Sequence, residues 1–436
     1  MGGNRKKKLT IEGTVAPGFE SVKKLYEHNM RTLEEENTQL CVYVGEDKVV
    51  DLWASATEDP NFSPDSLVNV FSSSKNFEAI AMAALAGKGL LNYNARISEY
   101  WPEFAANGKE DVTVADLMRH EAGLAVFDTT LEKEDILAEN IKLNNVGVVI
   151  ENHAQKFRRG AGNKREYHAI TRGWIVNEVF RRIDPEGRTI GQFLREEISG
   201  PLEADVFMGV KDEQLNRISK LSMLGIGFQI VESLKPAFLG RRIEFNCFQG
   251  IGKLLGVIPL LLNNTMTGAP EPVRGMKGMG QIEFWNDPAI SRAEIPSANA
   301  KCSARGLATV AAMMANGGKW AGQEFLNEAA WAALHEAPIK GDMGFTATTF
   351  TQGGVALFPP TTPECTKMDR AMNQGREGFY GWMGLGGSLF QWHPQYKIGF
   401  GYVPTSLYVF DFVNERGKAY QAEVLSCVEK MSPDVV

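Results

Sequence analysis

A serine and a lysine three positions apart, Ser72 and Lys75, form the stretch that could most readily do chemistry. In one turn of helix, positions i and i+3 lie on the same face, so the two side chains can touch if a helix begins here. A serine hydroxyl is a weak nucleophile until a base takes its proton. A lysine can be that base where burial disfavours its ammonium form and lowers its pKa. The pattern therefore predicts an activated nucleophile.

The surroundings of this pair favour chemistry over a surface role. Ser-x-x-Lys alone is weakly specific, because a second match, Ser21-Val22-Lys23-Lys24, occurs in the chain, and we interpret that match as a solvated helix face. Lys75, by contrast, is flanked by Phe71 and Phe77 and followed by an apolar, alanine-rich segment over 79–86. The competing interpretation is a helix-capping serine beside a lysine whose stem lies on apolar surface.

Two further stretches can supply partners for this pair. Tyr167 follows a basic, glycine-containing loop at 156–164 and begins an expected helix. A tyrosine acts as a base only where its pKa, about 10 when unperturbed, is lowered, and the ammonium of Lys75 can do this. The glycine-rich segment 381–388 precedes an expected strand, where backbone N–H groups can hold the oxyanion of acyl transfer. Taken singly, Tyr167 is more typical of a core tyrosine and the segment of a flexible turn.

The composition of the 436-residue chain excludes several classes of partner. A net charge of −7 argues against nucleic acid. The five cysteines and six histidines are scattered without metal-ligand spacing, and no Walker loop or Gly-x-Ser-x-Gly elbow occurs, so we expect no metal and no cofactor. Scattered thiols without a secretory signal indicate the cytoplasm. No run approaches ~20 apolar residues, so no stable membrane insertion is expected.

Residues 1–16 predict a disordered basic tail, which Pro17-Gly18 ends. Gly2 follows the first methionine, but Lys6 stands where a myristoylation signal requires Ser or Thr. The sequence therefore leaves open whether Gly2 is lipidated.

Helical and strand-like patterns occur in an order that places strands near both ends of the chain. Apolar residues at helical spacing predict helices over 22–33, 79–86, 131–153, 167–183, 303–314 and from 414 onwards. Paired apolar runs predict hairpins over 40–54 and 389–403. This order predicts one sheet built from both termini with a helical unit inserted between. The apolar stretch 219–262 fits a lid, an interface or a membrane contact.

Several ordered stretches together resemble one family. They are Phe71–Lys75, Val112–Leu124, Tyr167–Ala169, Ser303–Ala308, Gly384–Ser388 and Gly399–Val403. From about Phe19 to Val403, the chain resembles the serine β-lactamase and penicillin-binding-protein superfamily, in its class-C-like branch of carboxylesterases and β-lactamase-related proteins. The resemblance implies a β-lactamase/transpeptidase-like α/β (α+β) fold, in which an antiparallel sheet from both termini is flanked by helices and carries an inserted all-helical subdomain.

The same resemblance implies a division of the chain. The catalytic domain would span 17–410, with a sheet part over about 17–70 and 300–436 and a helical part over about 71–300. Residues 411–436 would form a C-terminal helix that packs on the sheet.

The resemblance also implies a role for each site residue. Ser72 matches the acylating serine, Lys75 the lysine that activates it, and Tyr167 the tyrosine that shuttles protons with that lysine. Trp382-Met383-Gly384 matches the Lys-Thr-Gly motif on the strand beside the active site. Leu385 then supplies the second backbone N–H of the oxyanion hole, and Ser72 supplies the first.

Two positions depart from the β-lactamase pattern. Ala169 stands where β-lactamases have an asparagine, and Trp382 where they have a cationic lysine. The groups that would hold a β-lactam amide and a substrate carboxylate are therefore missing. Phe71, Phe379 and Tyr380 join Trp382 in an expected apolar wall, so we expect an uncharged, moderately hydrophobic ester.

These observations predict a serine carboxylesterase that forms an acyl-enzyme on Ser72, with Lys75 and Tyr167 as general bases and a small-molecule ester or amide as substrate. Acyl transfer to an alcohol or amine through the same acyl-enzyme stays open, as does a homo-oligomeric state, and true β-lactamase activity fits less well. The rival from another class is a non-catalytic scaffold with 219–262 as its interface. The intact set of three residues argues against the scaffold.

Overall fold

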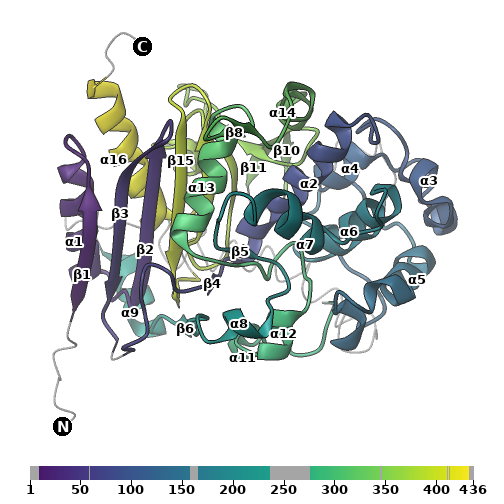
Figure 1. The fold of residues 1–436 in the computed structure, drawn as a ribbon, viewed down its shortest axis with the longest axis horizontal. Coiled ribbons are helices and arrows are strands. Elements are labelled where there is room, and N and C mark those ends of the chain that lie inside the picture. The colour runs from purple at the N-terminus through teal and green to yellow at the C-terminus, as the bar shows by residue number, and fades with distance from the viewer. Residues whose placement is uncertain are drawn as a thin grey trace.

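The computed structural model describes residues 9–57, 59–157, 165–235, 275–343, 346–409, 411 and 413–431. Within these ranges the largest sheet has nine antiparallel strands in the order β1-β3-β2-β15-β14-β13-β12-β11-β10 (Figure 1). The strands come from both ends of the chain, as expected. They are β1 (Thr10–Val15), β2 (Asn37–Val44), β3 (Asp47–Ser55), β10 (Ile339–Asp342), β11 (Ala347–Phe350), β12 (Ala356–Leu357), β13 (Tyr380–Met383), β14 (Leu389–His393) and β15 (Ile398–Pro404).

Helix α13 (Ala304–Ala315) covers one face of this sheet, over β2, β14 and β15. It is rich in alanine, and two glycines of β15, Gly399 and Gly401, lie beneath it. A Cβ on either glycine would collide with backbone atoms of α13. The small residues on both sides therefore let the helix lie directly on the central strands.

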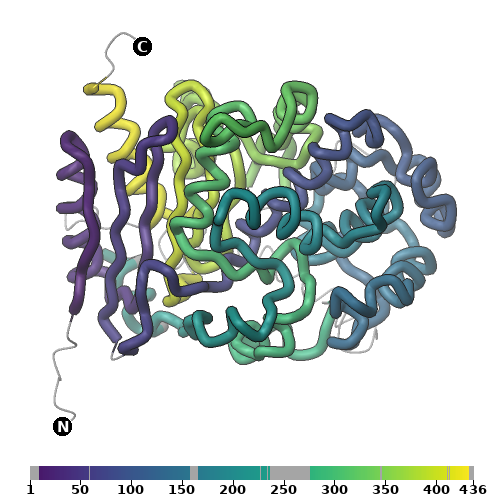
Figure 2. The backbone as a smooth tube through the Cα atoms, viewed as in Figure 1, coloured from purple at the N-terminus to yellow at the C-terminus, as the bar shows by residue number. Residues whose placement is uncertain are grey.

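The opposite face of the sheet is covered by α1 (Glu20–Thr32) and α16 (Glu415–Met431), which contact each other. Buried residues of both helices share one apolar cluster with the side chains that point to this face from the sheet. The first and last described helices therefore pack on one another, and together they form the helical layer on this face of the sheet (Figure 2).

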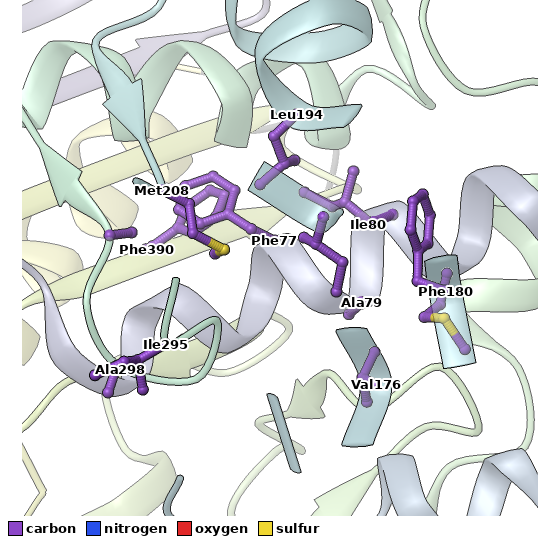
Figure 3. Close-up of a cluster of buried hydrophobic side chains, with 14 of the residues drawn as sticks. Phe77, Ala79, Ile80, Val176, Phe180, Leu194, Met208, Ile295, Ala298 and Phe390 are labelled. Carbon is purple, nitrogen blue, oxygen red and sulfur yellow. The ribbon is translucent and has the colours of Figure 1, made fainter. Parts of the chain in front are cut away.

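The inserted part of the chain is organised around α2 (Lys75–Gly87), which packs on α6 (Thr171–Ile183), α7 (Ile190–Phe193) and α14 (Glu328–His335). Figure 3 shows side chains of α2, such as Phe77 and Ile80, among apolar neighbours from several elements. The other described helices are α3 (Ile97–Tyr100), α4 (Val114–Met118), α5 (Asn145–Asn152), α8 (Asp212–Leu215), α9 (Ile226–Leu234), α11 (Ile282–Trp285), α12 (Pro288–Arg292) and α15 (Lys367–Asn373).

Short strands interrupt this part, so the prediction of an all-helical insertion is wrong in detail. Two of them, β5 (Val206–Phe207) and β6 (Ser222–Met223), lie within 71–300. A three-stranded sheet joins β4 (Val68–Asn69), β7 (Lys301–Cys302) and β5, and it ties the start of the insertion to its end. The remaining pairs are β6 with β16 (Ser406–Leu407), and β8 (Lys319–Trp320) with β9 (Gln323–Glu324).

Two predictions of local structure are wrong. Residues 10–15 of the expected disordered tail form β1, an edge strand paired along its length with β3. The expected helix over 131–153 is limited to α5, preceded by two short 3₁₀ turns at Glu134–Ile136 and Ile141–Leu143. Ile136 and Ile141 are buried from these turns and Val146 and Ile150 from α5, so the stretch does not form one continuous helical face.

The apolar stretch 219–262 lies largely outside the described residues, which include only β6, α9 and their flanks. Across the described ranges, no helix is both long and apolar enough to cross a bilayer.

Candidate active site

Ser72 lies in a tight 3₁₀ turn, Phe71–Ser74, between β4 and the start of α2. Phe71 has φ of 44°, a left-handed conformation that is strained for an aromatic residue and costs about 1–3 kcal/mol. Its ring packs edge-on against Trp285, with the two ring centroids 5.1 Å apart. Packing therefore holds a strained residue directly before the predicted nucleophile.

Lys75 is 1% exposed, and its Nζ lies among three oxygen atoms. It donates to the backbone oxygens of Ala169, at 2.6 Å, and Ser297, at 3.1 Å, and it lies 3.4 Å from Ser72 Oγ. Burial lowers the pKa of Lys75 well below its usual 10.5 and favours the neutral amine. A neutral amine has two N–H groups and one lone pair. The two carbonyls take the N–H groups, which leaves the lone pair for the hydroxyl proton of Ser72.

A buried ion pair faces Lys75 from two helices. Arg172 of α6 donates to Glu78 of α2 at 2.8 Å, and both side chains are fully buried. Arg172 also donates to the backbone oxygen of Lys75 at 3.1 Å, while Ser297 Oγ donates to Glu78 at 2.5 Å. After burial, Glu78 raises the pKa of Lys75 and Arg172 lowers it. The pair thus fixes the surroundings of the base while its two charges offset each other.

Tyr167 lies beside this lysine, with Lys75 Nζ 5.0 Å from the centre of its ring. Its hydroxyl oxygen accepts a hydrogen bond from Trp382 Nε1 at 3.0 Å. Burial raises the pKa of Tyr167 above 10.0, and hydrogen bonds with Ser72 and Trp382 lower it only in part. The expectation of a lowered pKa is therefore wrong, because burial outweighs the neighbouring groups. Tyr167 is a protonated phenol, suited to giving a proton.

His120 packs against the ring of Tyr167, and His168, the next residue in the chain, is hydrogen-bonded to His120. The backbone N–H of His168 donates to His120 Nδ1 at 3.0 Å, and the His120 ring centre lies 4.8 Å from that of Tyr167. Both histidines are fully buried, and burial lowers the pKa of each. These neutral rings therefore position the tyrosine and bring no charge to it.

The segment 384–388 follows β13 and is fastened to the turn that carries Ser72. Ser388 Oγ donates to the backbone oxygen of Val70 at 2.7 Å, and Ser73 Oγ lies 3.2 Å from the backbone oxygen of Ser388, to which it donates. A Cβ on Gly384 would collide with Val70 and Ser388, so only glycine permits this approach. The two parts of the predicted oxyanion hole are therefore held against each other.

The two backbone N–H groups predicted to hold an oxyanion are those of Ser72 and Leu385. Neither has an acceptor among the described residues. The side chain of Leu385 is 55% exposed, so this edge of the site is open to solvent and apolar. Two unused donors beside a nucleophile are what acyl transfer requires.

Other residues predicted at the site lie elsewhere. Phe379 is fully buried and packs against His393, and Tyr380 packs edge-on against His335. The Met383 side chain lies in the apolar cluster of α1 and α16. The expected apolar wall is therefore wrong for Phe379 and Tyr380, and Trp382 is the residue of β13 that contacts Tyr167.

Sequence reasoning missed the groups that surround Lys75. Glu78 and Arg172 are 94 positions apart, and the acceptors from Ala169 and Ser297 are backbone atoms that leave no trace in residue type. One signal was available: Glu78 is a lone carboxylate in an apolar helix, and such a group needs a buried partner. Among the described residues, no group of three or more His, Cys, Asp or Glu side chains is placed to hold a metal ion.

The comparison with known families agrees with this geometry. The Beta-lactamase family model matches residues 22–423, most of the chain. The chain belongs to the beta-lactamase family. The chain is similar to a protein of Mycobacterium tuberculosis called Esterase/beta-lactamase LipL, with 29% identity over 293 residues. That alignment spans 66% of this chain and 60% of the relative, less than two thirds of its length.

Three solved structures share the fold over nearly the whole chain. A family VIII carboxylesterase has a TM-score of 0.74 and 24% identity, with 96% of this chain and 100% of that chain covered. EstA from Arthrobacter nitroguajacolicus Rue61a has a TM-score of 0.70 and 22% identity, covering 96% and 99%. A penicillin-binding-protein homologue from Caulobacter crescentus has a TM-score of 0.68 and 24% identity, covering 95% and 100%. At these identities the likeness establishes the β-lactamase/transpeptidase-like fold.

Proposed function

We propose that this member of the beta-lactamase family is a serine hydrolase of the carboxylesterase type, which works through an acyl-enzyme on Ser72. The observation that carries the proposal is the environment of Lys75. A buried, neutral amine with both N–H groups on carbonyls and its lone pair towards Ser72 Oγ is a ready general base.

Acylation follows from these positions. Ser72 Oγ attacks the ester carbonyl while its proton passes to the Lys75 amine, and the carbonyl electron pair moves onto the oxygen. The N–H groups of Ser72 and Leu385 stabilise that oxyanion, an effect worth ~3–4 kcal/mol per donor in other enzymes. As the oxyanion collapses, the bond to the alcohol breaks, and Tyr167 protonates the departing oxygen. The Lys75 ammonium then returns a proton to Tyr167.

Deacylation reverses the proton path. As a water molecule attacks the acyl carbon, its proton passes to the Tyr167 oxygen while the Tyr167 phenol passes its own proton to the neutral Lys75. When the tetrahedral intermediate collapses, the bond from the acyl carbon to Ser72 Oγ breaks, and the Lys75 ammonium gives its proton to Ser72, which leaves as the hydroxyl. Trp382 Nε1, bonded to the Tyr167 oxygen, stabilises the negative charge that forms on the phenol during transfer. Acyl transfer to an alcohol would follow the same steps with the alcohol in place of water.

The charges around the site support an uncharged substrate. Trp382 stands where a β-lactamase has a cation, and its N–H is engaged by Tyr167. The described cations closest in sequence to Tyr167, Arg165 and Arg172, are paired with carboxylates at 2.7 and 2.8 Å. We therefore propose a neutral, moderately hydrophobic ester or amide as substrate. The name of the M. tuberculosis relative, Esterase/beta-lactamase LipL, supports the same class.

The test is the hydrolysis of p-nitrophenyl butyrate by the Ser72→Ala variant. The proposal predicts a fall of at least about 10³-fold in kcat, since the variant lacks the hydroxyl on which the acyl-enzyme is proposed to form. Ser21→Ala is the matched control, because Ser21 belongs to the second Ser-x-x-Lys match on the outer helix α1. Unchanged hydrolysis by Ser72→Ala would contradict the proposal.

We also propose that the protein acts in the cytoplasm. Its thiols support this: Cys41, Cys302, Cys365 and Cys427 are all free in the described residues. Fractionation of cells that express the full-length chain tests the proposal, and recovery with a membrane or secreted fraction would contradict it.

A further inference from the structure

The segment Gly384–Ser388 is held along its length by the residues that begin α16. Asn414 Nδ2 donates to the backbone oxygen of Gly384 at 3.0 Å and to that of Ser388 at 3.1 Å. Arg416 donates to the backbone oxygen of Gly386, which lies between them. Three alternate carbonyls of the segment are therefore bound from the same side.

The orientation of the Asn414 amide follows from its partners. Both partners are carbonyl oxygens, so the NH₂ group must face them, and both of its hydrogens are used. The side chain is 3% exposed, so little water is available to replace either bond.

These bonds fix the direction of the Leu385 N–H. The oxygen of Gly384 and the N–H of Leu385 belong to one peptide group, which is planar and trans, so they point in opposite directions. A donor that pins the oxygen on the α16 side therefore aims the N–H away from α16. That N–H has no acceptor among the described residues, and the same segment is fastened to the Ser72 turn through Ser388.

We propose that Asn414 is a positioning residue for the oxyanion hole, which acts through the Gly384–Leu385 peptide group and does not touch the substrate. The inference rests on the proposed acyl-enzyme function. Beyond orientation, a hydrogen bond to the peptide oxygen polarises the peptide and strengthens its N–H as a donor.

A purely structural role must be separated from this one. Asn414 has φ of 53°, a left-handed conformation that asparagine, aspartate and glycine all accept. The N–H of Gly387 also donates to the Gly384 oxygen, at 3.2 Å, so the loop keeps one bond without Asn414. Asn414→Gly and Asn414→Asp both retain the backbone conformation and remove the two donors. If the backbone conformation were the whole role, both variants would be active.

Asn107 provides a matched control. It too has a left-handed conformation, with φ of 58°, and its Nδ2 donates to two backbone oxygens, of Glu151 at 3.1 Å and Asn152 at 3.0 Å. It lies in the helical part and takes no part in the site. Asn107→Gly should therefore leave kcat unchanged.

The experiment measures p-nitrophenyl butyrate hydrolysis with the folded fraction checked by thermal unfolding. In Asn414→Gly and Asn414→Asp, kcat should fall about tenfold with KM within twofold of wild type, since the loss falls on the transition state. Affinity for a boronic acid, which forms a tetrahedral adduct with the serine, should fall by the same factor. A kcat within threefold of wild type in either folded variant would overturn the proposal.

Hydrogen exchange provides a readout that does not depend on turnover. Peptides that contain 384–388 should exchange faster in the Asn414 variants than in wild type. In the control Asn107→Gly, the same peptides should exchange at the wild-type rate. Unchanged exchange there overturns the positioning role even if the protein has no esterase activity. An inactive wild type with accelerated exchange in the variants would instead contradict the proposed function and leave Asn414 as the anchor of the segment.

Discussion

At the scale of single residues, the chemistry depends on the protonation of two buried groups. Lys75 has its pKa lowered well below 10.5 by burial, and Tyr167 has its pKa raised above 10.0 by burial. Burial disfavours the charged form of each group. The charged form of Lys75 is the protonated ammonium, so its pKa falls, whereas the charged form of Tyr167 is the deprotonated phenolate, so its pKa rises. Both side chains are therefore uncharged: Lys75 is an amine that can accept a proton, and Tyr167 is a phenol that can donate one.

This arrangement predicts the pH dependence of ester hydrolysis. The active form has neutral Lys75, so kcat/KM rises with pH through the lowered pKa of Lys75 and is level well below pH 10.5. The fall that comes from ionisation of Tyr167 begins only above about pH 10. A pH–rate profile tests this, and an activity that is confined to strongly alkaline pH would contradict it.

Lys75→Arg removes the rising limb altogether, because a guanidinium stays protonated and cannot accept the proton of Ser72. We expect kcat to fall by about 10³-fold or more. Lys24→Arg, on the exposed face of α1, is the control and should keep the activity of wild type.

The ion pair of Glu78 and Arg172 predicts a loss of stability when one charge is removed. Glu78→Gln leaves the fully buried guanidinium without its counter-charge, and we expect a destabilisation of about 3–5 kcal/mol. Urea unfolding measures it. Asp111→Asn breaks the exposed pair of Arg96 and Asp111 and should change little. An equal effect of the two substitutions would contradict the role given to burial.

At this scale, the sequence was sufficient to predict which side chains meet through local spacing, but it did not predict how deeply each side chain is buried. The i, i+3 spacing and apolar surroundings of Ser72 and Lys75 were sufficient to predict that the two side chains meet. The pKa direction of Tyr167 was predicted wrongly, because the depth at which a side chain lies depends on elements distant in the chain. Glu78 and Arg172 were missed for the same reason.

At the scale of elements, the site is assembled where the Ser72 turn meets the end of β13. Gly384 permits the contact, because a side chain there would strike the backbone of Val70 and the hydroxyl of Ser388. The aromatic Phe71, held at positive φ, is the strained member of this junction.

Gly384→Ala should therefore separate β13 from the turn. We expect kcat to fall by about 100-fold, because a displacement of ~1 Å in an oxyanion donor is enough for such a loss. Gly227→Ala in α9 is the matched control, since its added Cβ meets nothing within 4 Å. Wild-type activity in Gly384→Ala would mean that the two parts move independently.

Periodicity predicted the long helices and both hairpins, because their patterns reflect one buried face. It failed over the first part of 131–153, where Ile136 and Ile141 are buried from 3₁₀ turns. It also failed at β1, whose residues are largely exposed and whose strand depends on pairing with β3, about 40 positions away. Long-range pairing of this kind has no local signature.

At the scale of the whole molecule, both ends of the chain contribute to the sheet beside which the site lies. β1 is the outer strand, and it covers the edge of β3 along six residue pairs, from Thr10 with Ser55 to Val15 with Val50. The C-terminal helix α16 begins directly after Asn414, and the Asn414 side chain binds the segment 384–388.

A chain that starts at residue 17 should therefore be less stable than the full chain. It lacks β1, so β3 becomes an exposed edge with unpaired backbone groups and a tendency to pair with other chains. We expect a lower thermal midpoint and aggregation detectable by light scattering. A chain that starts at residue 9 keeps β1 and is the control. Equal midpoints for the two chains would contradict a structural role for β1.

The central claim is that Ser72 is an activated nucleophile in the folded protein. The most direct measurement is labelling with a fluorophosphonate, followed by mass spectrometry of the modified peptide. The account predicts one adduct, on Ser72, that is lost in Ser72→Ala, strongly reduced in Lys75→Arg and absent after denaturation. Folded wild-type protein without an adduct at Ser72 would contradict it.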